Sequence, residues 1–129
     1  MITFKQFIEV QDRLSEAQKT NYVLRHELLA KKDDISKRLK KVMGKQPVCW
    51  VFGKGPQFRE LEFTITWYLP VRQTQEDDEF FNHMAKIAAV AEMQKTAPEM
   101  ELTKTLISPR ARRDIDPKTH FVFTRKTRR

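Results

Sequence analysis

The sequence predicts an α+β domain in which helices cover one face of a four-stranded antiparallel sheet. Apolar residues recur at helical spacing over residues 4–43 and again after residue 74. A strictly alternating stretch occupies residues 58–69, and the other apolar runs are short and bounded by turn residues. The element order is therefore helix, hairpin, helix, hairpin. The 129 residues suit a single domain, 1–129, made of a helical part (1–43) and a ββαββ body (48–129).

The first helix is predicted to start near residue 4 and to end at Gly44, with Pro47 beyond it. Thr3 and Gln6 form a capping-box pattern at its start. Residues at intervals of seven form a long amphipathic stripe: Phe7, Leu14, Asn21, Leu28, Ile35 and Val42. Val10, Ala17 and Leu24 add a second seam, which Lys31 and Arg38 interrupt. The stretch "KKDDIS" leaves open whether this part is one helix or two.

This stripe has two interpretations, a coiled coil between copies of the chain or a cover for the protein's own sheet. Six heptads span about 60 Å at 1.5 Å per residue, which exceeds the length of a small sheet. We therefore expect part of the helix to project and to make the protein a homo-oligomer. The predicted oligomer interface consists of Phe7, Leu14, Asn21, Leu24, Leu28 and Ile35.

The strands and the second helix follow from local patterns. "VCWVF" (48–52) predicts a strand, followed by the turn "GKGP". In the next strand Leu61, Phe63, Ile65, Trp67 and Leu69 should face the core, and Glu60, Glu62, Thr64, Thr66 and Tyr68 the solvent. Thr74 should cap a helix that Pro98 stops. "EMELTKTLI" and "HFVFTRK" predict the second hairpin, with Phe121 and Phe123 as core residues.

Positive charge is concentrated at the two ends of the chain. The formal net charge is +8, and residues 110–129 hold eight Lys or Arg against two Asp. Such a basic end can bind a nucleic-acid backbone or an acidic protein, or it can simply be a solvated edge strand. The candidate binding residues are Arg110, Arg112, Arg113, Lys118, Arg125, Lys126, Arg128 and Arg129.

The remaining titratable residues do not predict catalysis. The acidic run 76–79 matches the first turn of a helix, where it complements the helix dipole, better than a metal site. The three histidines show no metal-ligand spacing, and Cys49 fits a buried thiol, with a nucleophile pair to His120 as the alternative. We expect no cofactor, no metal and no enzyme activity. A small hydrolase or nuclease is a third hypothesis, after an assembly subunit and a nucleic-acid-binding regulator.

A single cysteine suits a reducing compartment, and no apolar run is long enough to span a membrane. "MITFKQFIE" resembles the openings of many short proteins encoded by tailed bacteriophages. That resemblance implies a small virion or host-takeover protein. We expect a non-enzymatic assembly subunit, in the cytoplasm or in a virion assembled there, that contacts an acidic partner or nucleic acid through its basic hairpin. The alternative is a dimeric nucleic-acid-binding regulator.

Overall fold

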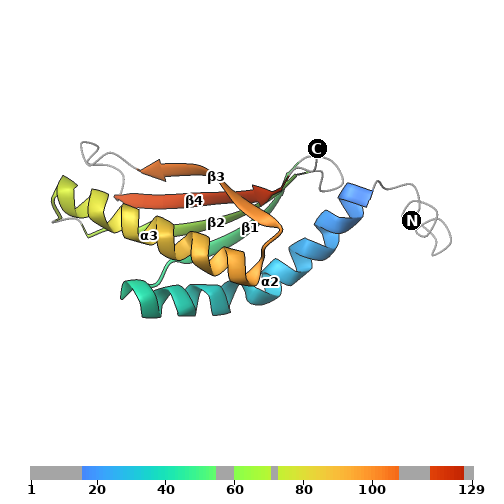
Figure 1. Ribbon diagram of the computed structural model, residues 1–129, viewed down its shortest axis with the longest axis horizontal. Coiled ribbons are helices and arrows are strands. Elements are labelled where there is room, and N and C mark those ends of the chain that lie inside the picture. The colour runs from blue at the N-terminus through green and yellow to red at the C-terminus, as the bar shows by residue number, and fades with distance from the viewer. Residues whose placement is uncertain (1–15, 55–59, 71–72, 108–116, 127–129) are drawn as a thin grey trace, which may run out of the picture.

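The computed structural model describes residues 16–54, 60–70, 73–107 and 117–126. Its elements are α2 (Glu16–Met43), β1 (Val48–Lys54), β2 (Glu60–Tyr68), α3 (Gln75–Thr96), β3 (Met100–Ile107) and β4 (Lys118–Arg125). The strands form one antiparallel sheet in the order β1-β2-β4-β3. Both helices lie against the same face of this sheet (Figure 1). The predicted α+β class and the four-stranded antiparallel sheet are confirmed.

Helix α2 runs through the "KKDDIS" stretch without interruption, so residues 16–43 form one helix. It ends at Gly44, whose φ of 75° lies in the left-handed region that favours glycine. The Gly44 N–H donates to the Lys40 carbonyl oxygen at 2.7 Å, which closes the last turn. The predicted start near residue 4 lies outside the described residues.

The middle of the heptad stripe, from Asn21 to Ile35, packs inside this chain, where we expected an interface between copies. Leu24, Leu28 and Ile35 are at most 4% exposed and belong to the core cluster of this chain. Asn21 is also buried, and its Oδ1 accepts a hydrogen bond from Arg125 Nη1 at 3.0 Å. Phe7 and Leu14 lie outside the described residues. A stripe that covers the protein's own sheet is no longer available to another chain, although self-association itself stays a prediction.

The core lies between the helices and the covered face of the sheet. The inward residues of β2 are buried as predicted, and Phe121 and Phe123 of β4 join them. Trp67 and Phe121 contact edge to face with ring centroids 6.0 Å apart. The Trp67 indole N–H donates to the Lys45 carbonyl oxygen at 2.8 Å, so the largest core side chain keeps its polar atom satisfied.

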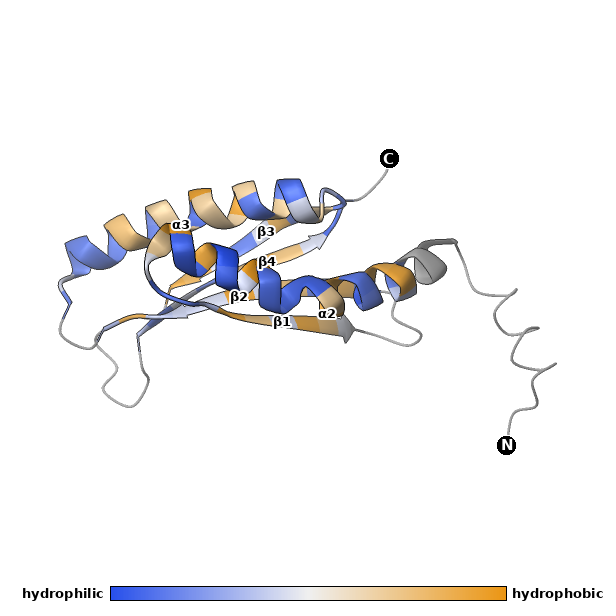
Figure 2. Cartoon of the chain, turned by 90° about the horizontal axis from the view of Figure 1, so that it is seen from below, coloured by the Kyte–Doolittle hydropathy of each residue, from blue (hydrophilic) through white to orange (hydrophobic). Residues whose placement is uncertain are grey.

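Helix α3 begins as predicted. Thr74 is the N-cap, and its hydroxyl accepts from the Asp77 N–H at 3.1 Å. Arg38 of α2 and Glu92 of α3 join the two helices through an ion pair, with Nε and Oε1 at 2.6 Å. Figure 2 shows the helices side by side, with hydrophilic ends on α3 and a more hydrophobic middle. No helix among the described residues is long and apolar enough to cross a membrane.

Candidate nucleic-acid interface

The face of the sheet that the helices leave uncovered is the candidate site. Successive side chains of a strand point to opposite faces, so the register assigns each residue to one of them. Trp50 of β1 pairs with Thr64 of β2, Thr64 with Val122 of β4, and Val122 with Lys104 of β3. These four residues therefore form one row across the open face.

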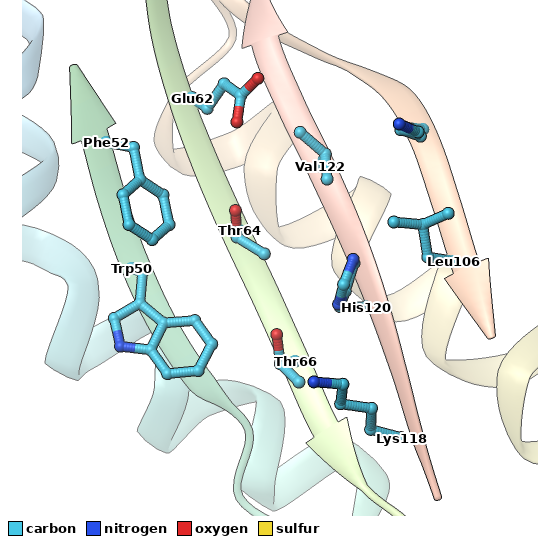
Figure 3. A pocket seen from close by; sticks show the side chains of 10 residues that line it. Trp50, Phe52, Glu62, Thr64, Thr66, Leu106, Lys118, His120 and Val122 are labelled. Carbon is cyan, nitrogen blue, oxygen red and sulfur yellow. The ribbon is translucent and has the colours of Figure 1, made fainter. Parts of the chain in front are cut away.

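The open face is hollowed because of where small and large side chains fall. The inner strands β2 and β4 contribute Thr64, Thr66 and Val122 to its floor. The outer strands contribute larger side chains, among them Trp50 from β1 and Leu106 from β3. The result is a depression of about 350 Å³ (Figure 3). This volume lies at the lower end of the range of small-molecule sites.

One side of the depression is aromatic. Trp50 and Phe52 are 39% and 46% exposed, in contrast to Trp67 on the covered face, which is fully buried. Both rings stand on β1 two residues apart and line the depression (Figure 3). Their Cα atoms are about 6.6 Å apart at 3.3 Å per residue. Exposed rings at this spacing offer neighbouring surfaces on which flat groups can stack.

The other side of the depression is basic. Lys104 of β3 and Lys118 of β4 line it, together with His120, while Glu62 of β2 adds one carboxylate beside Phe52. Burial lowers the pKa of the His120 imidazole below its usual value, and the nearby Lys118 and Lys104 lower it further. His120 is therefore mostly neutral at pH 7, so one ring nitrogen donates and the other accepts a hydrogen bond. The two ammonium groups supply the positive charge.

Thr66 adds a polar group to the floor that its neighbours do not satisfy. Its side chain is 1% exposed, although alternation predicts it on the solvent side of β2. Its Oγ1 has no hydrogen-bond partner among the described residues. Because an unmet buried hydroxyl costs about 1–3 kcal/mol, a bound molecule or water that reaches it gains a hydrogen bond. Thr66 itself lies beneath the depression with its hydroxyl covered by its neighbours.

The structure describes three of the eight basic C-terminal candidates, and it does not bring them together. Lys118 lines the depression, but Arg125 lies on the covered side of β4 and bonds Asn21. Seven residues separate the two, which is about 23 Å along a strand. Lys126 is exposed just beyond β4. Five other candidate residues lie outside the described part of the chain: Arg110, Arg112, Arg113, Arg128 and Arg129.

Sequence reasoning missed most of this site. The stretch "VCWVF" predicts an apolar strand but does not assign its two faces, so it does not predict the exposure of Trp50 and Phe52. Their spacing of two residues was the available signal. Lys104 and His120 could be added only once the register placed them opposite Val122 and Thr66.

The described residues do not form either of the catalytic arrangements considered from the sequence, a Cys–His pair or a metal site. Cys49 pairs with Ile65 on the covered face, whereas His120 pairs with Thr66 on the open face, so they cannot form a nucleophile pair. Burial raises the pKa of the Cys49 thiol to about 12, which leaves it protonated. Within the described residues, no group of three or more His, Cys, Asp or Glu side chains could hold a metal ion.

Comparison of the chain with protein-family models, with curated proteins and with solved structures finds no match.

Proposed function

We propose that the open face of the sheet binds single-stranded nucleic acid. The observation that carries this proposal is the pairing of an exposed aromatic side, Trp50 and Phe52, with a basic side, Lys104 and Lys118, across one depression. Bases stack on exposed aromatic rings, and phosphates bind to lysine ammonium groups. The two requirements meet on one surface. Sheet-based RNA-binding modules use the same combination, which is an analogy of architecture only.

The arrangement favours single strands over duplexes. In a duplex the faces of the bases are stacked on one another, so they cannot contact Trp50 or Phe52. In a single strand two successive bases can stack on these neighbouring rings. The backbone then lies toward Lys104 and Lys118.

Tryptophan fluorescence tests this directly, because the chain has two tryptophans and Trp67 is fully buried. Single-stranded DNA and RNA of about ten nucleotides are titrated into the protein at about 50 mM salt. We expect saturable quenching of the Trp50 emission. Because Trp50→Ala removes this signal, the variant and the wild type are compared by fluorescence anisotropy of a labelled strand. Trp50→Ala should weaken binding at least about fivefold, because stacking contributes about 1–3 kcal/mol per base.

Tyr22→Ala is the matched control, since Tyr22 is similarly exposed but lies on α2. It should bind like the wild type. The proposal fails if the protein shows no affinity at low salt, or if it binds a duplex more tightly than the single strand. It also fails if Trp50→Ala binds as well as the wild type.

A protein partner in an assembly is the second candidate for this face. Val48, Tyr68 and Leu106 are each about 40% exposed on it, and exposed apolar groups rimmed by polar ones are typical of protein interfaces. Such a protein would be the assembly subunit that we expect from the sequence, and Phe7 and Leu14 remain predicted residues of its oligomer interface. Light scattering at several protein concentrations tests it. A ring or larger closed oligomer that Tyr68→Ser dissociates supports the assembly role, and an unchanged mass in that variant excludes this face.

A further inference from the structure

Helix α3 carries a second apolar surface, on the side that faces away from the sheet. Phe80, Met84 and Ile87 are 69%, 41% and 53% exposed, and Ala91 is exposed as well. Their spacing of four, three and four residues places them in one stripe along the helix. The buried residues of α3, such as Ala85 and Ala89, lie on its opposite side. We call these four exposed residues the α3 stripe.

We propose that two copies of the chain form a homodimer in which their α3 stripes pack antiparallel. A twofold axis that crosses the helix between residues 85 and 86 places Phe80 opposite Ala91 of the other copy. The same axis places Met84 opposite Ile87. Each layer thus joins a larger side chain to a smaller or equal one, and every stripe residue meets another stripe residue. A stripe that matches itself in this way is what a twofold interface requires.

The charges at the two ends of α3 fit this orientation. Its first turn exposes Glu76 and Asp77 and its last turn exposes Lys95, whereas Asp78 of the first turn is buried. An antiparallel pair sets the acidic first turn of each helix beside the basic last turn of the other. A parallel pair would set acid beside acid. The helix dipoles also favour the antiparallel arrangement, because opposite partial charges then lie together.

The dimer is independent of the proposed nucleic-acid site. The α3 stripe lies on the helix side of the sheet, whereas Trp50 and Lys104 lie on the open face. Dimerisation therefore leaves both depressions uncovered. Four residues per helix form a small interface, so we expect a weak dimer with a dissociation constant in the micromolar range.

The first test compares Met84→Glu with Val23→Glu. Both variants place a carboxylate at an exposed apolar position of a helix, but Val23 lies on α2, away from the stripe. Light scattering at about 200 µM should give twice the 15.4 kDa mass for the wild type and for Val23→Glu. Met84→Glu should be monomeric with an unchanged circular dichroism spectrum. With one carboxylate from each copy in the central layers, we expect at least about a hundredfold weaker dimerisation.

The second test fixes the orientation with disulfides. Phe80 and Ala91 are 11 positions apart. In the antiparallel dimer the two copies of Phe80 are therefore separated by about 16 Å along the helix axis, whereas Phe80 of one copy lies beside Ala91 of the other. A disulfide needs Cα atoms within about 7 Å. Under mild oxidation an equal mixture of the Phe80→Cys and Ala91→Cys proteins should give a covalent dimer of one copy of each. Neither variant should cross-link alone.

A monomeric wild type at about 200 µM overturns the proposal, because the α3 stripe then does not bind a second copy. Cross-linking of Phe80→Cys with itself overturns the antiparallel orientation. A dimer that survives Met84→Glu places the interface elsewhere on the chain.

Discussion

Replacing Leu28 by alanine should destabilise the folded chain, whereas replacing Val42 by alanine should not. Both residues belong to the same heptad register of α2, two repeats apart. A coiled-coil interface would use them alike. In the structure Leu28 is 1% exposed within the core, and Val42 is 70% exposed. Val42 lies in the last turn of α2, next to the final helical residue Met43.

The expected magnitudes differ widely. A Leu→Ala change at a buried site costs about 2–5 kcal/mol, because it removes apolar contacts and leaves a cavity. Val42→Ala should change the free energy of unfolding by less than about 0.5 kcal/mol, since surface changes are small and alanine favours the helix. Against a total stability of about 5–15 kcal/mol, Leu28→Ala should lower the urea midpoint markedly.

Urea unfolding followed by circular dichroism measures both variants, at protein concentrations about twentyfold apart. The loss in Leu28→Ala should be the same at both concentrations, because its contacts lie within one chain. A loss that appears only at the higher concentration would mean that Leu28 stabilises an oligomer. A loss in Val42→Ala equal to that in Leu28→Ala would also refute the structural assignment of this helix.

Three further predictions concern titratable side chains. Replacing Lys104 and Lys118 together by glutamine should make the plot of log affinity for single-stranded DNA against log salt less steep by about 1.4, because each lost phosphate contact accounts for about 0.7. As a control, Lys86→Gln on α3 should leave this slope unchanged. An NMR titration should give His120 a pKa below its usual value of 6.5, so below that pH the unfolded chain binds more protons than the folded chain and the fold loses stability on acidification. His120→Gln should lose less stability over the same pH range. An unshifted pKa of His120 would contradict this prediction. Cys49, with its thiol pKa raised to about 12, should react with a thiol reagent at pH 8 only as fast as the protein unfolds, and fast labelling of the native protein would contradict its burial.

Local patterns predicted the elements well because their causes are local. The Thr74 cap depends on residues within one helical turn, and the alternation of β2 depends on residues within one strand. Both features can therefore be predicted from a short stretch of sequence. Gly44 marks the end of α2 for the same reason, since its positive φ is a property of one residue.

The candidate site was harder to predict because it depends on register. Thr66 looks solvent-exposed from alternation, yet the residues beside it on β1 and β4 bury it. Similarly, heptad spacing cannot distinguish a helix that covers its own sheet from one that covers another chain. The deciding quantity is what lies opposite Leu28, and that is set by residues far away in the sequence.

The strand order has a consequence for synthesis on the ribosome. β4 is an inner strand, although it follows every other described strand in the chain. Until residues 118–125 emerge, β2 lacks a neighbour along one edge and β3 has nothing to pair with. Nascent chains shorter than this can pair β1 with β2, but they should expose apolar surface and attract chaperones until β4 joins β2 to β3 in a late step.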